Sequence, residues 1–322
     1  MSNKVVVFSQ IDSDVLESLQ ARYNVVLINP KNGDVNEQIR TEVVDADAMI
    51  GSGRLLNESN LATAQKLKII SSVSVGYDNY DVEYLNQQKI WLANTPHVLT
   101  ETTADLAFTL LMSAARQVPH LDQWTKQGQW KRTVSTAQFG REIFGKKLGI
   151  VGLGNIGAAI ARRGFYGFNM DVLYHNRNEK IELAQSLNAQ YRNLEALLQE
   201  SDFVVVAVDL NSDSKALIGT KEFDLMQKHA VFVNIARGSV VDEQALFEAL
   251  QEQKIFAAGL DVYQKEPLQD SELFKLNNIV TLPHVGSATA ETRRKMVELA
   301  YRNLEDALEG RTPRYLVNAT FG

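Results

Sequence analysis

Residues 150–157 read Ile-Val-Gly-Leu-Gly-Asn-Ile-Gly and contain the pattern G-x-G-x-x-G at Gly152, Gly154 and Gly157. The apolar run before this segment predicts a buried strand, and the run after it predicts a helix. In a strand–turn–helix of this kind, Gly152 allows a tight turn and Gly154 lets the backbone approach a pyrophosphate. Gly157 lets the helix pack closely on the strand. The segment therefore predicts an α/β domain that binds a dinucleotide at the helix N-terminus.

The same alternation of short apolar runs and amphipathic stretches extends in both directions. The expected strands are Val5–Phe8, Val25–Ile28, Ala46–Ile50, Lys68–Val73, Ile90–Ala93, Leu148–Val151, Met170–Tyr174, Phe203–Val208, Ala230–Ile235, Ile255–Leu260 and Asn278–Leu282. The main expected helices are Asp12–Tyr23, one that begins near Thr100 and is nearly all apolar over Ala104–Ala115, Asn155–Gly164, Asp242–Gln251 and Thr289–Glu309. This rhythm predicts parallel sheets covered by helices.

The length of 322 residues is sufficient for two domains. The second series of strands closes near residue 283, and the final helix is expected to return to the first domain. We therefore expect a substrate domain at 1–98 plus 288–322 and a dinucleotide-binding domain at 99–287.

Composition excludes several classes of function. A net charge of −6 argues against a nucleic-acid binder, which needs a basic face for phosphates. The absence of cysteine excludes disulfides and thiolate metal sites, and no metal is expected. The N-terminal apolar run is too short for a signal peptide, and no stretch reaches the roughly 18 apolar residues of a membrane span. We expect a cytoplasmic protein.

The residues after the second strand of the dinucleotide domain indicate the cofactor. NAD enzymes place an acidic residue at the end of this strand to bind the ribose, whereas NADP enzymes use arginine. Here Asp171 stands at the start of the strand, and His175, Asn176, Arg177 and Lys180 follow its end. Arg177 can hold a 2′-phosphate with paired, charge-assisted hydrogen bonds, which predicts a preference for NADPH. The alternative is an ordinary solvated surface arginine.

Arg237, Glu266 and His284 each follow an expected strand downstream of the glycine turn, at the sheet edge where open α/β folds bind ligands. Reduction of a 2-keto acid needs a hydride at C2 and a proton on the carbonyl oxygen. Protonated His284 can donate that proton near neutral pH, and Glu266 can bond its other ring nitrogen. Arg237 can bind the carboxylate and polarise the carbonyl. Each residue alone is common in structural roles; together they predict a catalytic site.

Two segments outside these motifs leave alternatives open. The turn at Val75 and Gly76 has N–H groups able to grip a carboxylate, or it is a plain strand-to-helix turn. The polar stretch 117–145 contains Trp124, Trp130 and Phe139, which predict either a subunit contact or a loop packed on its own domain.

With these motifs the chain resembles the D-isomer-specific 2-hydroxyacid dehydrogenase family over essentially its whole length. The resemblance is carried by Ser74–Asp78, Asn94–Pro96, Thr100-Glu101, the glycine turn, the Arg237 segment, Gly259–Pro267 and Pro283–Ser287. Within the family, Phe165–Met170 and Pro283–Arg293 are most similar to glyoxylate/hydroxypyruvate reductases that also act on 2-ketogluconate.

The resemblance implies two Rossmann-like domains, a flavodoxin-like substrate domain and an NAD(P)-binding domain, with an interdomain cleft and a homodimer built through the cofactor domain. It implies catalytic roles for Arg237, Glu266 and His284, and substrate contacts at Val75, Gly76, Arg237, His284 and Ser287. Together with the residues read directly, the candidate cofactor contacts are Thr103, Gly152, Gly154, Asn155, Ile156, Gly157, Asn176, Arg177, Lys180, Ile235, Asp261 and Gly286.

Two positions depart from the family pattern. Asp209 stands where relatives have proline or a small residue, near the expected adenosine. Gln138, followed by Phe139, stands where similar reductases have a tryptophan that reaches the partner's active site. Glu266 argues against formate dehydrogenase, which pairs its histidine with glutamine. A nucleotide-sensing co-repressor on the same scaffold is the alternative to an enzyme.

Overall fold

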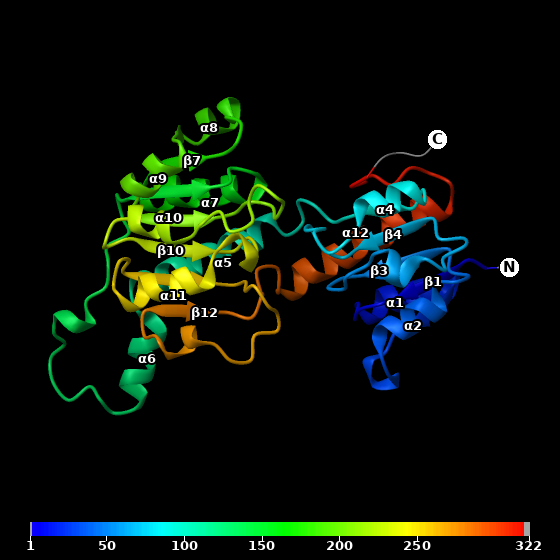
Figure 1. The fold of residues 1–322 in the computed structure, drawn as a ribbon, viewed down its shortest axis with the longest axis horizontal. Helices are drawn as coiled ribbons and strands as arrows, with labels where there is room; N and C mark the ends of the chain where they lie inside the picture. Colours follow the sequence, from blue (N-terminus) through cyan, green and yellow to red (C-terminus); the bar gives the residue numbers. More distant parts are fainter. Residues whose placement is uncertain (1, 319–322) are drawn as a thin grey trace. The chain divides into compact units, whose positions relative to one another are not determined.

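The computed structural model describes residues 2–318. The chain divides into two compact units, which we call unit 1 (residues 1–99 and 288–322) and unit 2 (residues 100–287). Each unit is an α/β fold around one parallel sheet (Figure 1), as the alternating sequence pattern predicts.

Unit 1 contains a five-stranded parallel sheet with the order β2-β1-β3-β4-β5, which is the flavodoxin-like order. Its strands are β1 (Lys4–Val7), β2 (Asn24–Leu27), β3 (Ala48–Gly51), β4 (Ile69–Ser72) and β5 (Trp91–Ala93). Its helices are α1 (Ser13–Arg22), α2 (Val35–Glu42), α3 (Glu58–Leu61), α4 (Val82–Gln87) and α12 (Ala290–Leu308).

Helix α12 comes from the end of the chain and packs against β3 and β4 of unit 1 (Figure 1, orange beside blue). Its apolar side, with Met296, Ala300 and Leu304, is buried. The buried Ser71 hydroxyl in β4 donates a hydrogen bond to the Ala300 carbonyl at 2.7 Å. The core of unit 1 is therefore complete only with the C-terminal helix in place.

Unit 2 contains a seven-stranded parallel sheet with the order β12-β11-β10-β9-β6-β7-β8, the arrangement of a Rossmann domain extended by one strand. Its strands are β6 (Lys147–Val151), β7 (Asp171–His175), β8 (Gln190–Tyr191), β9 (Phe203–Val206), β10 (Val231–Asn234), β11 (Ala257–Leu260) and β12 (Ile279–Thr281). Its helices are α5 (Thr100–Ala115), α6 (Val118–Lys126), α7 (Asn155–Phe168), α8 (Ile181–Ser186), α9 (Leu194–Glu200), α10 (Thr220–Leu225) and α11 (Glu243–Gln251).

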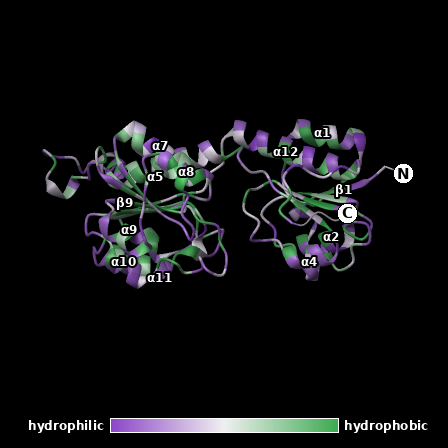
Figure 2. Ribbon diagram, turned by 90° about the horizontal axis from the view of Figure 1, so that it is seen from above, coloured by the Kyte–Doolittle hydropathy of each residue, from purple (hydrophilic) through white to green (hydrophobic). Residues whose placement is uncertain are grey.

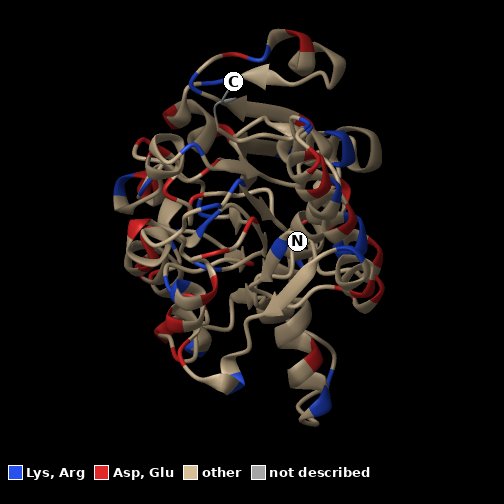
Figure 3. Ribbon diagram, turned by 90° about the vertical axis from the view of Figure 1, so that its right-hand side faces the viewer, with Lys and Arg blue, Asp and Glu red and all other residues tan. Residues whose placement is uncertain are grey.

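The sheets lie between helical layers, and their strands are the most hydrophobic parts of both units (Figure 2). Strands β9, β10 and β11 are buried at every residue. Both faces of a parallel sheet are covered, so its central strands are continuous apolar runs, not alternating ones. Charged residues of both signs are interspersed along the outer helices (Figure 3). Within residues 2–318, no helix combines the length and apolar character that a membrane span requires.

The structure corrects two details of the expected elements. Helix α7 does not end at Gly164 but continues to Phe168. Gly164 lies inside the helix because the helix packs closely there: a Cβ atom at this position would lie 2.7 Å from Leu148 Cδ2. The stretch 117–145, for which no helix was predicted, contains helix α6, none of whose residues is buried.

Candidate active site

The turn between β6 and α7 has the geometry that its glycines predict. Gly152 adopts a φ of +106°, and a Cβ atom there would lie 2.6 Å from the Ala207 carbonyl oxygen. A Cβ atom at Gly157 would lie 2.1 Å from the Gly152 carbonyl oxygen. No atom lies within 4 Å of the position that a Cβ would take at Gly154. The first two glycines are needed by the fold, and the third leaves the backbone open to a ligand.

Helix α7 begins directly after this turn, with Gly154 as its N-cap and exposed Asn155 and half-buried Ile156 in its first turn. The first N–H groups of a helix have no helical acceptor and carry a partial positive charge, so they suit a pyrophosphate. The glycine turn and the start of α7 therefore fit the pyrophosphate of a dinucleotide. Asn176 supports the turn from the end of β7, because its side-chain oxygen accepts a 2.6 Å hydrogen bond from the Leu153 N–H.

The end of β7 carries the residues expected near the ribose. Arg177 is exposed and forms a 2.7 Å ion pair with Asp213, also exposed. Lys180 is exposed as well, and Asp171 lies at the opposite end of the strand. The Arg177–Asp213 pair was not anticipated, because the two residues are separated by 36 positions in the sequence. Asp209, the departure noted in the same loop, is exposed.

Glu266 and His284 form the closest polar pair among the expected catalytic residues. Glu266 Oε2 lies 2.6 Å from His284 Nδ1, and Glu266 Oε1 accepts a 2.9 Å hydrogen bond from the Tyr263 N–H. Burial alone raises the pKa of Glu266, but the hydrogen bonds from His284 and Tyr263 and the charge of Arg237 outweigh it and hold that pKa below its usual value. Glu266 is thus an anion at neutral pH, with one oxygen committed to orienting the imidazole.

The backbone around His284 is fixed by Asp261 at the end of β11. The Asp261 carbonyl accepts from the His284 N–H at 2.9 Å, and its carboxylate accepts from the N–H groups of Val285 at 2.7 Å and Gly286 at 2.8 Å. These bonds stabilise the left-handed backbone of His284, whose φ is +53°. Burial raises the pKa of Asp261. Asp261, expected as a cofactor contact, therefore also fixes the backbone position of His284.

Arg237 follows β10 and lies beside the loop that carries Glu266. Gly238 makes this possible, since a Cβ atom there would overlap the Tyr263 backbone, at 1.8 Å from its carbonyl carbon. The Arg237 guanidinium donates to the Ala236 carbonyl at 2.8 Å and lowers the pKa of Glu266 through its charge. The ends of β10 and β11 are therefore packed backbone to backbone, which brings the expected carboxylate binder close to the His–Glu pair.

Helix α5 contributes to the same edge of the sheet. Thr103 is buried, and a Cβ atom at Gly286 would lie 3.4 Å from Thr103 Cγ2 and 3.1 Å from Asp261 Oδ2. Ile235 is also buried at the end of β10, and Ser287 is half-buried. Thr103, Asp261 and Gly286 are thus packed together next to His284.

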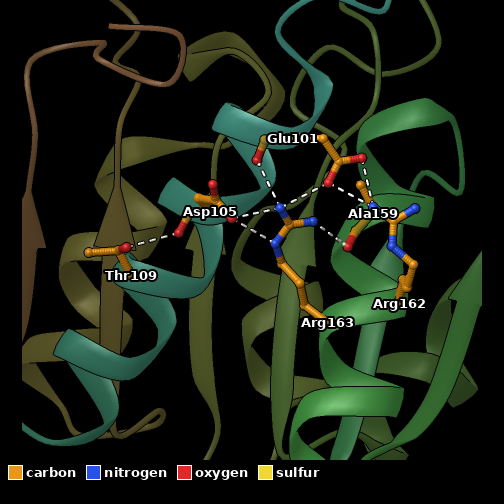
Figure 4. Close-up of polar contacts among 6 residues, drawn as sticks. All are labelled: Glu101, Asp105, Thr109, Ala159, Arg162 and Arg163. Carbon is orange, nitrogen blue, oxygen red and sulfur yellow. Dashed lines mark hydrogen bonds and ion pairs between the residues drawn. The ribbon is translucent and has the colours of Figure 1, made fainter. Parts of the chain in front are cut away.

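Ion pairs join α5 to α7 (Figure 4). Arg162 bonds the Glu101 carboxylate at 2.7 Å, and Arg163 bonds Asp105 at 2.6 Å while donating to the Ala159 carbonyl at 2.9 Å. The hydrogen bond from Arg162 lowers the pKa of Glu101. These contacts connect α7, which begins at the glycine turn, to α5, which carries Thr103, and no motif in the sequence indicated them.

A pocket of about 390 Å³ lies beside the His–Glu pair, with walls that include Tyr263, Phe274 and Leu282. The walls are mainly apolar. No cluster of side chains suited to a metal ion occurs in the described part of the chain.

Val75 and Gly76, the expected carboxylate grip, lie in unit 1, and the other expected site residues lie in unit 2. Both are half-buried and follow β4. Among the hydrogen bonds of residues 2–318, neither of their N–H groups has an acceptor in the protein.

Comparison with known proteins identifies the family and supports the fold. Residues 108–286 match the model of the NAD-binding domain of D-isomer specific 2-hydroxyacid dehydrogenases. The chain belongs to this family. It is an NAD(P)-dependent oxidoreductase that acts on CH–OH groups.

Relatives within the 2-hydroxyacid dehydrogenase family match over the full length. Glyoxylate/hydroxypyruvate reductase B of Enterobacter sp. (strain 638) is 41% identical over 99% of this chain and 98% of the relative. The Escherichia coli K12 protein of the same name gives the same identity and coverage. The solved NADPH-dependent glyoxylate/hydroxypyruvate reductase of Sinorhizobium meliloti, in complex with NADP and malonate, is 31% identical, with a TM-score of 0.86 over 98% of this chain and 97% of that one.

Proposed function

We propose that the protein is an NADPH-preferring reductase of small 2-keto acids, with glyoxylate, hydroxypyruvate and 2-ketogluconate as candidate substrates. The observation that carries this proposal is the 2.6 Å contact between Glu266 and His284 Nδ1, at the sheet edge that also bears the glycine turn. A proton donor held in this way suits the protonation of a carbonyl oxygen as C2 receives a hydride.

The roles of the residues follow from their contacts. Because Nδ1 of His284 faces Glu266, Nε2 is the ring nitrogen that donates to the substrate oxygen. The Glu266 carboxylate stabilises the imidazolium before this transfer. Arg237 binds the substrate carboxylate and polarises the carbonyl. The nicotinamide, when bound, supplies the hydride, so hydride and proton together convert the keto acid to the hydroxy acid.

The preference for NADPH rests on Arg177. This side chain is exposed at the end of β7, where the ribose of a dinucleotide on the glycine turn lies in Rossmann domains. A 2′-phosphate is a stronger partner for the guanidinium than the single Asp213 carboxylate, because it offers more acceptor oxygens and more charge. The Sinorhizobium meliloti relative, which is described as NADPH-dependent, supports this choice.

We also propose a homodimer built through unit 2. No residue of α6 is buried, and the segment from α6 to Phe144 exposes several apolar side chains. The exposed apolar residues of this segment are Val118, Trp130, Val134, Phe139 and Phe144. Exposure of Trp130 and Phe139 favours the subunit contact over a loop packed on its own domain. Light scattering on the purified chain tests this; a monomer at micromolar concentration would contradict it.

The decisive experiment is to follow oxidation of NADPH and NADH with glyoxylate, hydroxypyruvate, 2-ketogluconate, pyruvate and phenylpyruvate. We expect fast NADPH-linked turnover of one of the first three acids. No turnover of any of them, with tight cofactor binding, would contradict the proposal and favour a nucleotide-sensing role.

A further inference from the structure

Residues 94 and 95 donate hydrogen bonds to the carbonyl groups of the turn at residues 74–76. The Asn94 amide donates to the Val75 carbonyl at 2.8 Å. The Thr95 N–H and hydroxyl both donate to the Ser74 carbonyl, at 2.9 and 3.1 Å. Two successive carbonyl groups of the turn are therefore fixed by the segment after β5.

Fixing these carbonyls also fixes the N–H groups that follow them. In a planar trans peptide, the C=O and the N–H point in opposite directions. The Ser74 carbonyl shares its peptide plane with the Val75 N–H, and the Val75 carbonyl shares its plane with the Gly76 N–H. Because Asn94 and Thr95 hold both carbonyls, both N–H groups point away from the segment after β5.

Asn94 and Thr95 are themselves well anchored. The Asn94 N–H donates to the Tyr315 carbonyl at 3.1 Å, and its carbonyl accepts from the Asn303 side chain of α12 at 3.0 Å. Thr95 has no exposed surface. The Asn94 amide is thus presented to Val75 from a rigid backbone, so the hydrogen bond costs little side-chain entropy.

A chain of three hydroxyl groups holds the far side of the same turn. The Ser74 hydroxyl bonds the Gly76 carbonyl at 2.6 Å, the Ser72 and Ser74 oxygens are 2.7 Å apart, and the Tyr80 hydroxyl donates to Ser72 at 2.9 Å. A carbonyl can only accept, so Ser74 donates to Gly76, Ser72 donates to Ser74, and Tyr80 donates to Ser72. Each hydrogen bond between these hydroxyl groups therefore has a single possible direction. Tyr80 is buried, and burial raises its pKa.

We propose that Asn94, Thr95 and the Tyr80–Ser72–Ser74 hydroxyl chain are positioning residues that aim the Val75 and Gly76 N–H groups at the substrate carboxylate. This rests on the proposed function, because it assigns the carboxylate of a 2-keto acid to this turn. None of the five side chains acts on the reacting carbon. They act by removing the freedom of two peptide planes, so binding of the carboxylate needs no reorganisation of the backbone.

The test compares variants of the full-length protein in three measurements: steady-state kinetics with the best keto acid, binding of the non-reducible carboxylate oxamate to the NADPH complex, and binding of NADPH alone. Asn94→Leu keeps the volume of the side chain and removes its donor. We expect the KM of the keto acid and the Kd of oxamate to rise by about tenfold, the loss of one well-placed hydrogen bond. The Kd of NADPH and the melting temperature should change little.

Conservative pairs separate positioning from general stability. Ser74→Ala breaks the hydroxyl chain and Ser74→Thr keeps it, so only the first should raise KM, by roughly threefold. Thr95→Val and Thr95→Ser form a second pair of the same kind. Tyr80→Phe tests the outer end of the chain and leaves the volume of the core nearly unchanged.

Each outcome decides the matter. A rise in KM and oxamate Kd without a change in NADPH Kd supports the proposal. Unchanged KM in Asn94→Leu, or equal losses of oxamate and NADPH binding, overturns it while the reductase function stands. Wild-type protein that neither reduces keto acids nor binds oxamate overturns the proposed function itself.

Discussion

The turn after β6 in unit 2 and the turn after β4 in unit 1 both present backbone N–H groups, but they are built in opposite ways. The first uses glycines, because Gly152 and Gly157 leave no room for a Cβ atom. The second is held by polar side chains, among them Asn94, that bond its carbonyls. A turn built from glycines is specified by a short stretch of sequence. A turn held by hydrogen bonds from distant residues takes its shape only when the whole unit has folded.

The two turns differ in how they bind ligands. A variant that removes only the proton transfer should leave both turns unchanged. His284→Ala should lower kcat by on the order of 10²–10⁴-fold, the usual contribution of a general acid. The KM of the keto acid and the Kd of NADPH should stay close to wild type, because His284 supports neither turn. Stopped-flow measurement of hydride transfer checks this, and a near-normal rate would remove His284 as the proton donor.

The glycine turn should be the less tolerant of the two. Gly157→Ala places a Cβ atom 2.1 Å from the Gly152 carbonyl oxygen, so the turn must deform. We expect the Kd of NADPH to rise on the order of 100-fold. Gly167→Ala is the matched control, because it lies in the same helix with open space around its Cβ position. Equal cofactor affinity in the two variants, measured by fluorescence titration, would contradict the assigned role of Gly157.

Glu266→Gln sharpens the separation of chemistry from binding through pH. The amide keeps the size of the side chain and removes the negative charge that faces His284 Nδ1. We expect about a tenfold loss of kcat/KM for keto acid reduction at neutral pH, and this loss should shrink in acid, where Glu266 of the wild-type protein is itself protonated. Because the pKa of Glu266 is held below its usual value, its charge also stabilises the folded protein above the unfolded pKa.

That stabilisation is lost as the pH falls through the folded pKa of Glu266, so thermal melts of wild type and Glu266→Gln should converge in acid. Identical pH–rate profiles for the two proteins would argue against a functional His–Glu pair.

The smallest expected effect concerns Arg177, at the end of β7. Arg177→Met should weaken NADPH binding by roughly tenfold and leave NADH binding nearly unchanged, since only NADPH carries the 2′-phosphate. Asp213→Asn frees Arg177 from its ion pair and should strengthen NADPH binding by about threefold, as expected for an exposed pair. Asp209→Asn, on the same loop, is the control for a general change of charge. Equal losses for both cofactors in Arg177→Met would remove the 2′-phosphate role.

The sequence predicted the features that depend on neighbouring residues. The α/β class, the parallel sheets and the glycine turn all follow from local patterns, and the structure has them. The family assignment, made from short motifs, is confirmed by the match over residues 108–286. The predicted end of α7 at Gly164 was wrong. Glycine commonly marks the end of a helix, but this glycine lies inside the helix and allows close packing on Leu148.

Contacts between distant residues could not be predicted in this way. The Arg177–Asp213 pair, the bonds of Asp261 to the backbone after His284, and the Asn94–Val75 bond each join separate segments of the chain. Their residues are ordinary polar types in loops, and only the fold brings them together. The roles of the candidate site residues remain proposals that the experiments above address.

Helix α12 has a consequence for the order in which the protein forms. The strands of unit 1 are synthesised first, but the helix that covers β3 and β4 leaves the ribosome after all of unit 2. Until residues 290–308 emerge, an apolar face of the first sheet has no partner, whereas unit 2 already has every residue of its own core. We therefore expect unit 2 to complete its fold on the ribosome before unit 1, against the usual N-terminal-first order. A nascent chain that stalls before α12 presents an uncovered sheet face to chaperones and proteases.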